Sequence, residues 1–246
     1  MATEYGHDHL AGKQIVERHY YIIRKETMNQ EQYFGMAVIL SGPSGVGKTT
    51  IYNRMRFNQE NDKFNLNDFH FSVSCTTRPR RHDEIDGMSY RFLTEEQFQK
   101  HLDDNDFLEH AEVHGAHYGT LKSELQSIKT GQDVLFDIDI QGMRKIKAKL
   151  ADDPFFGPRL VTVFIMPPSL QELENRLRGR RTDAEDAIIR RLANAKREME
   201  AWREYDYVLI NKDSDESAKE IQKIMAAAHY RTRLITMETW KNESAF

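Results

Sequence analysis

Residues 42–50 have types and a spacing that suit the binding of phosphate groups. They fit the pattern G-x-x-x-x-G-K-[ST], with Gly42, Gly47, Lys48 and Thr49 in register. Glycines let the backbone curl so that successive N–H groups approach phosphate oxygens without a Cβ in the way. Lys48 adds a point charge, and the hydroxyl of Thr49 is a ligand for Mg²⁺. The stretch therefore predicts a phosphate-binding loop with a magnesium ion beside it.

The sequence on either side of this loop supports the same interpretation. Residues 36–40 form a short continuous apolar run, typical of a buried parallel strand, and the chain reads as helix from Thr49 onward. A helix that begins there directs the positive end of its dipole at the phosphates. The alternative is an ordinary glycine-rich turn, but the order of strand, glycine turn and helix favours a phosphate-binding loop.

Composition limits the class of protein. The 246 residues allow one sizeable domain with inserted subdomains, and a hydrophobic fraction of 39% with 30% charged residues is typical of a soluble globular protein. The lone Cys75 has no second cysteine with which to form an intrachain disulfide. The sequence also shows neither a signal-like start nor an apolar run of membrane-spanning length. We therefore expect a cytoplasmic protein without a membrane partner. A net charge of −4 argues against general nucleic-acid binding, while local arginine clusters suit a small polyanion.

Further strands and helices alternate along the chain. Their expected ranges are strand 69–75, strand 89–93, a helix from a Thr94–Gln97 capping box to about 103, alternating residues 107–113, helix 121–129, strand 133–137, a helix from 141, strand 160–166, a helix capped by Ser169 and Glu172, a long helix to about 202, strand 205–210 and a helix from about 215. The alternation implies an α/β fold with a parallel sheet flanked by helices. Residues 70–120 interrupt it and read as a small strand-rich insertion.

Several further segments make a specific family resemblance. Over about residues 36–224, the order and spacing of short sequence motifs resemble those of guanylate kinases. The segments that carry the resemblance are 71–78, 107–109, 118–120, 136–142, 167–169 and 176–182. The resemblance implies transfer of the γ-phosphoryl group of ATP to GMP, and to dGMP, with Mg²⁺ as cofactor. It also implies a P-loop core (36–68 and 121–235), a GMP-binding insertion (about 69–120) and a helical lid (about 176–195). Outside this domain lie an extension of unknown role (1–35) and a tail (236–246), and Met36, directly after the extension, is an alternative start.

The resemblance assigns site residues whose chemistry fits their roles. Guanine presents adjacent N1–H and N2–H₂ donors, and one carboxylate can accept both. Arginine forks suit the GMP phosphate, and a carboxylate at a strand end suits Mg²⁺ and its waters. The expected GMP-binding residues are Ser74, Arg78, Arg81, Glu84, Tyr90, Glu109, Tyr118, Thr120, Asp137 and Asp139, with Glu109 reading the base and Thr49 and Asp137 holding the metal.

The ATP site and the catalytic charges follow in the same way. The expected ATP-binding residues are Gly42, Pro43, Ser44, Gly45, Val46, Gly47, Lys48, Thr49, Thr50 and Asn211. The expected catalytic charges are Lys48, Arg176, Arg180 and Arg191, with Arg180 arriving on lid closure and no dedicated general base.

The chain departs from the family pattern in the loop that binds the GMP phosphate. The usual Arg-x-Pro-Arg-x-Gly-Glu reads here as Arg-Pro-Arg-Arg-His-Asp-Glu over residues 78–84, with Arg80 and Asp83 in place of proline and glycine. If the glycine position requires a positive φ, Asp83 can adopt it at modest cost.

Two other functions remain open at this stage, and so does the oligomeric state. The chain could be a catalytically inactive guanylate-kinase-like module that binds proteins, or a kinase for another small phosphorylated substrate. The intact loop with Lys48 and Thr49 argues against the first, and Glu109 with Ser74 and Tyr118 against the second. We expect ATP and GMP as partners of a monomer or homodimer.

Overall fold

A five-stranded parallel sheet forms the centre of the fold in the computed structural model, which describes residues 34–57, 69–113, 115–179 and 185–234. Its order is β2 (Phe69–Phe71), β7 (Asp133–Asp137), β1 (Ala37–Ser41), β8 (Leu160–Met166) and β9 (Tyr207–Ile210). All four pairings are parallel, as the alternation of strands and helices predicts. The apolar β1, β7 and β8 are in the middle because a strand covered on both faces needs apolar residues throughout.

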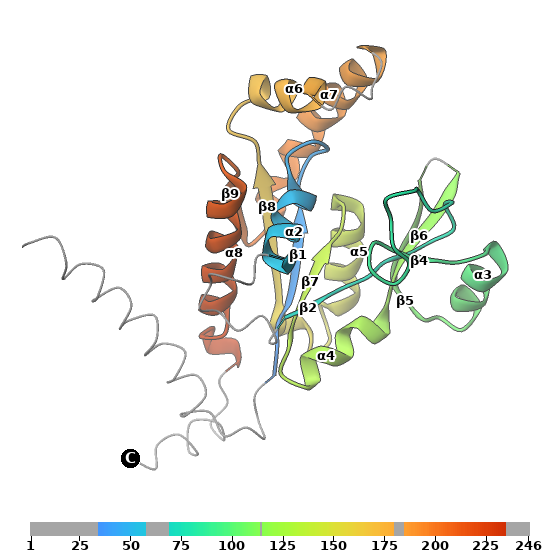
Figure 1. The fold of residues 1–246 in the computed structure, drawn as a ribbon. Helices are drawn as coiled ribbons and strands as arrows, with labels where there is room; N and C mark the ends of the chain where they lie inside the picture. The colour runs from blue at the N-terminus through green and yellow to red at the C-terminus, as the bar shows by residue number, and fades with distance from the viewer. Residues whose placement is uncertain (1–33, 58–68, 114, 180–184, 235–246) are drawn as a thin grey trace, which may run out of the picture.

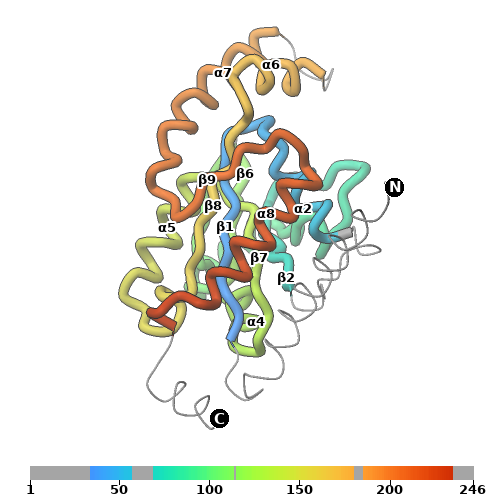
Figure 2. Tube along the Cα trace, turned by 90° about the vertical axis from the view of Figure 1, so that its left-hand side faces the viewer, coloured from blue at the N-terminus to red at the C-terminus, as the bar shows by residue number. Residues whose placement is uncertain are grey.

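Helices cover both faces of this sheet (Figures 1 and 2). On one face α2 (Lys48–Phe57) and α8 (Ser214–Ala228) enclose a core that includes Val38, Ile51 and Ile221. On the other face α4 (Gln126–Lys129) and α5 (Ile140–Leu150), with the 3₁₀ turn η5 (Glu200–Glu204), enclose a second core that includes Ile39, Phe136 and Met143. These two apolar layers hold the carboxyl ends of the strands in fixed positions, where ligands bind in open α/β sheets. Short 3₁₀ turns also lie at Gly157–Arg159 (η4) and Thr232–Leu234 (η6).

A separate four-stranded sheet forms the insertion, to the right of the main sheet in Figure 1. Its order is β4 (Arg91–Phe92), β3 (Cys75–Thr76), β6 (Ala116–Leu121) and β5 (Phe107–Val113), with β3 and β4 parallel and the other pairs antiparallel. Helix α3 (Glu95–Asp103) begins with the predicted Thr94–Gln97 capping box. The insertion has its own small core, where Phe98 stacks on Phe107 with ring centroids 4.5 Å apart.

The prediction of one strand over residues 69–75 is wrong, because this segment is divided between the two sheets. Phe69–Phe71 pairs with β7 in the main sheet, whereas Cys75–Thr76 pairs with β4 and β6 in the insertion. Between them Ser72 N donates to Leu135 O at 3.0 Å, and Ser74 O accepts from Arg91 N at 2.9 Å. The insertion therefore starts after β2, later than the expected boundary at about residue 69.

The buried carboxylate of Glu124 joins the two sheets at this crossing. It lies in the 3₁₀ turn η3 (Lys122–Leu125), and its oxygens are 2.7 Å from His70 Nε2 of β2 and 2.7 Å from Arg91 NH2 of β4. The backbone N–H of Val73 adds a third contact at 3.3 Å. Burial alone would raise the pKa of Glu124, but these partners outweigh burial and hold the pKa below its usual range. The helix expected over residues 121–129 is thus this 3₁₀ turn followed by the short α4.

Two helices extend beyond the carboxyl ends of the strands of the main sheet, at the top of Figure 1: α6 (Leu170–Gly179) and α7 (Glu185–Met199). Ser169 Oγ accepts from Glu172 N at 3.1 Å at the start of α6, as its sequence predicts. Leu173, Leu177 and Ile188 form the apolar contact between the two helices. In the described part of the chain, no helix is long and apolar enough to cross a membrane.

Candidate active site

The loop between β1 and α2 has the backbone of a phosphate cradle. Gly45 and Gly47 adopt φ values of 87° and 102°, which a residue with a side chain adopts only at a cost. A Cβ on Gly47 would also lie 2.6 Å from Asn211 Nδ2. Lys48 begins α2 and donates from Nζ to Gly42 O at 2.9 Å, so its ammonium group folds back over the loop. Backbone N–H groups, the start of a helix and a positive charge thus meet at one place.

Val46 O is the point at which other elements fix this loop. It accepts from Asn211 Nδ2 at 2.8 Å and from Arg176 NH1 at 3.0 Å. Asn211 is buried directly after β9, and Ser217 Oγ donates to its Oδ1 at 2.9 Å, which orients the amide. Two donors on one carbonyl oxygen restrain the peptide plane that Val46 O shares with the N–H of Gly47.

Arg176 and Arg191 bring α6 and α7 to the same loop. Arg176 uses its remaining nitrogens on Asn211 O at 3.0 Å and on Glu172 Oε1 at 2.9 Å. Arg191 NH2 donates to Ser44 Oγ at 2.8 Å. Both predicted catalytic arginines therefore lie at the phosphate cradle. Arg180, the third predicted arginine, lies outside the described residues.

A cavity of about 510 Å³ lies between α2 and the insertion. Of the predicted residues, the lining includes Thr49, Ser74, Arg81, Glu84, Tyr90 and Asp137. Asp137 ends β7 beside this cavity. Partial desolvation by the surrounding protein raises the pKa of its carboxyl, while the charge of Lys48 acts in the opposite direction. The hydroxyl of Thr49 and the carboxylate of Asp137 are oxygen donors in one cavity, which fits Mg²⁺ because this ion takes few protein ligands and completes its shell with water and phosphate.

The arginine loop on the far side of the cavity is organised by Glu84. Arg78 binds the Glu84 carboxylate through NH1 at 3.1 Å and NH2 at 2.6 Å, and Arg81 N donates to it at 2.8 Å. Hydrogen bonding to Glu84 raises the pKa of Arg78, and the same contact lowers the pKa of Glu84. The Arg78 guanidinium also lies 5.5 Å from the ring centroid of Tyr90, which packs edge-on against Tyr118 at 6.0 Å.

Asp83 in this loop needs no special backbone conformation. Among the described residues, the one non-glycine residue with a positive φ is Asn105, at 53°. The exchange of the family's glycine for Asp83 therefore causes no strain of the kind that a positive φ would bring.

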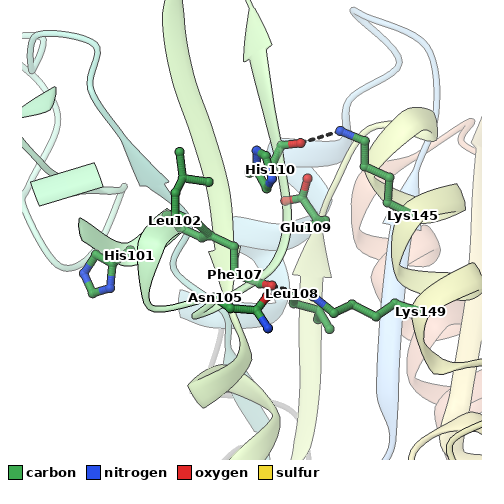
Figure 3. A pocket seen from close by; sticks show the side chains of 9 residues that line it. All are labelled: His101, Leu102, Asn105, Phe107, Leu108, Glu109, His110, Lys145 and Lys149. Carbon is green, nitrogen blue, oxygen red and sulfur yellow. Dashed lines mark hydrogen bonds between the residues drawn. The ribbon is translucent and has the colours of Figure 1, made fainter. Parts of the chain in front are cut away.

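Ser74, which lines the large cavity, is connected to Glu109 through the hydroxyl of Thr120. Thr120 Oγ1 donates to Glu109 Oε1 at 2.9 Å and lies 3.5 Å from Ser74 Oγ. Burial raises the pKa of Glu109, with the Thr120 hydrogen bond acting against it. Asp139 caps α5 by accepting from Gly142 N at 2.8 Å. Glu109 itself lines a smaller cavity of about 220 Å³ between β5 and α5 (Figure 3).

Comparison with known proteins decides the family. The family model described as guanylate kinase matches residues 35–228. The chain belongs to the guanylate kinase family. It is 41% identical over 215 residues to the guanylate kinase of Bartonella henselae, covering 87% of this chain and 90% of that protein. It is 44% identical over 198 residues to that of Chelativorans sp., covering 80% and 85%. A crystal structure of guanylate kinase from Anaplasma phagocytophilum superimposes with a TM-score of 0.67 at 30% identity, covering 90% of this chain and 98% of that one.

Membership in the guanylate kinase family agrees with the fold, but sequence reasoning missed part of the cavity wall. Tyr52, Asn53 and Arg56 line the cavity together with Thr49. Tyr52 Oη donates to Ser72 O at 3.0 Å, and Arg56 NH1 donates to Met88 O at 3.0 Å. These residues follow Thr49 at intervals of three, four and seven, so helical periodicity from the phosphate-binding loop could have found them.

Proposed function

We propose that this protein transfers the γ-phosphoryl group of ATP to GMP, giving ADP and GDP, and that it also accepts dGMP. One observation carries the proposal: a single cavity is lined by Thr49 from the phosphate-binding loop and by Arg81 and Tyr90 from the insertion. Phosphoryl transfer requires donor and acceptor phosphates to meet in line within one enclosed space. The guanylate kinases that match most of the chain support the same reaction.

On the ATP side, the backbone around Gly45 and Gly47 would hold the β- and γ-phosphates. Lys48, now bonded to Gly42 O, would exchange that carbonyl for phosphate oxygens. Thr49 and Asp137 would hold Mg²⁺, partly through water. When bound, the ion supplies positive charge that neutralises the phosphate oxygens.

On the acceptor side, the arginine loop would bind the GMP phosphate. Arg78 and Arg81 offer planar donor groups, and the phenols of Tyr90 and Tyr118 add neutral donors. Glu84 accepts from Arg78 and from the backbone of Arg81, which aligns the loop before GMP binds. Preorganisation of this kind lowers the entropic cost of binding.

Glu109 would recognise the guanine base. Its carboxylate can accept from N1–H and N2–H₂ together, whereas adenine presents an acceptor at N1. Thr120 donates to one of its oxygens and fixes its orientation, and Ser74 and Asp139 would complete the base contacts. Burial raises the pKa of Glu109, so as the pH falls its carboxylate becomes protonated earlier than an ordinary carboxylate would. Protonation removes the negative acceptor and would weaken recognition of guanine.

Charge stabilisation around the transferring phosphoryl would come from Lys48, Arg176, Arg180 and Arg191. Such a transition state needs alignment and positive charge more than a general base. Closure of α6 and α7 over the loop would exclude water that could accept the phosphoryl group.

A coupled assay of ADP formation with ATP, Mg²⁺ and each of GMP, dGMP, AMP, CMP and UMP tests the proposal. We expect turnover with GMP and dGMP and little with the others. Strong turnover with a different monophosphate would reassign the substrate, and no turnover with any would favour a protein-binding module.

A further inference from the structure

One face of α5 points toward the strand that carries Glu109. Gly142, Lys145 and Lys149 are spaced by three and four residues, so they share a side of the helix. Lys145 and Lys149 bind β5, and a Cβ added at Gly142 would meet the Glu109 carboxylate. The face belongs to the main domain, whereas β5 belongs to the insertion.

The two lysines bind β5 on either side of Glu109 (Figure 3). Lys149 Nζ donates to Phe107 O at 2.7 Å, and Lys145 Nζ donates to His110 O. The pairing of β5 with β6 is irregular between Phe107 and Glu109, so the sheet does not fix this part of the strand completely. Lys149 supplies a restraint at this irregular part of β5, and Lys145 adds one at His110, in the regular part next to Glu109.

The absence of a side chain at Gly142 leaves room for the Glu109 carboxylate. A Cβ at this position would lie 3.2 Å from Glu109 Oε2 and 2.4 Å from Ile138 Cγ2. The carboxylate therefore lies against the first turn of α5. Any side chain at Gly142 would displace it or the neighbouring isoleucine.

Apolar packing fills only part of the space between α5 and β5, where Leu108 of β5 belongs to the same buried cluster as Met143 and Ile146 of α5. The cavity of about 220 Å³ lies there, and its lining includes Glu109, both lysines, His101 and His110. Asp139, at the start of α5, adds a negative charge near Glu109 that opposes its ionisation, and Lys145 favours it. Polar contacts across this cavity therefore hold the two elements together beside the buried cluster that contains Leu108.

We propose that the α5 face of Gly142, Lys145 and Lys149 positions Glu109 for the base of the nucleoside monophosphate. Lys145 acts by holding the strand beside Glu109 and by placing a positive charge near its carboxylate, and Gly142 acts by leaving the space that the carboxylate occupies. The proposal rests on the proposed role of Glu109 and adds residues that need not touch the nucleotide.

Lys145→Met is the main test, and Lys147→Met is its matched control. Lys147 lies on the same helix but donates to Glu204 O at 2.6 Å in η5, away from the insertion. Methionine retains the length and helix propensity of lysine and removes its charge. We expect Lys145→Met to raise KM for GMP by roughly fivefold to tenfold, the effect of one lost hydrogen bond, with KM for ATP and kcat within about twofold of the parent. Lys147→Met should change neither KM.

A double-mutant cycle with Glu109→Gln separates positioning from a general structural effect. If Lys145 acts through Glu109, its effect on KM for GMP should largely disappear in the Glu109→Gln background. An undiminished effect there, or equal behaviour of Lys145→Met and Lys147→Met, would overturn the proposal. If Glu109→Gln alone leaves GMP use unchanged, the proposed role of Glu109 fails, and that result is distinct from failure of the α5 face.

Gly142→Ala tests the space requirement independently. Alanine is the better helix former, so the change should not weaken α5 through its intrinsic propensity. We expect a KM increase for GMP with little change in KM for ATP, and thermal unfolding measured alongside identifies any loss of folded protein. A folded Gly142→Ala variant with the parent's KM for GMP would contradict the role of Gly142.

Discussion

Arg176 NH1 donates to Val46 O at 3.0 Å, which links α6 directly to the phosphate-binding loop. The same guanidinium reaches Asn211 O and Glu172 Oε1, so one side chain connects the loop, the end of β9 and its own helix. An arginine expected to stabilise charge also has a positioning function in this structure. Its planar fork provides three donor directions that a lysine cannot reproduce.

Arg176→Lys should therefore reduce activity although the charge is retained. We expect kcat/KM for ATP to fall by at least about tenfold, because a point charge cannot hold Val46 O and Asn211 O together. Steady-state kinetics at saturating GMP measure this. Full activity of the lysine variant would mean that charge alone matters at this position.

Lys48→Ala should leave the fold intact and lower kcat by on the order of 10²–10³, because one preorganised charge at the transferring phosphoryl is lost. Lys223→Ala is a suitable control, since Lys223 is an exposed lysine of α8 that pairs with Glu220. Circular dichroism of both variants should match the parent. Normal turnover of a folded Lys48→Ala protein would remove Lys48 from the mechanism.

The Glu124 junction predicts a pH dependence of stability. Its folded pKa is lowered, so its stabilising contribution is fully present above the ordinary carboxyl range and is lost as the pH falls through that range toward the folded pKa. Glu124→Ala should lower the free energy of unfolding by on the order of 3 kcal/mol at neutral pH, since it removes a buried charged partner. Urea unfolding at pH 7 and pH 4 measures both quantities. The difference between parent and variant should shrink at the lower pH, and a constant difference would contradict the assignment.

The main sheet and the phosphate-binding loop were predictable because local signals are strong there. The apolar β8 matches its predicted range of residues 160–166, and the glycine pattern of residues 42–50 specifies its own backbone. The order of strand and helix then implies parallel pairing. Where a residue acts through its own backbone conformation or its spacing along a helix, its position can be predicted with little knowledge of the tertiary structure.

Pairing partners and shared contacts were not predictable from the sequence. Alternation over residues 69–75 indicates extended chain, but it does not say that two different sheets take the two ends. Asp139 was expected at the base, and its additional function as the cap of α5 depends on where that helix begins. The buried Glu124 contacts His70 and Arg91, which are distant from it in the sequence, so no local sequence pattern predicts this junction.

The guanine-reading function of Glu109 is the central claim, and Glu109→Gln tests it most directly. Glutamine retains the shape but presents an NH₂ group to one guanine donor, and losing a charge-assisted hydrogen bond costs roughly 1.5–3 kcal/mol. The measurement is kcat/KM for GMP and for AMP with parent and variant enzyme under the same conditions. We predict a fall of at least about tenfold for GMP and a smaller preference for GMP over AMP, because a glutamine amide can pair with adenine's acceptor and donor. A variant that discriminates between GMP and AMP as well as the parent does would contradict the account.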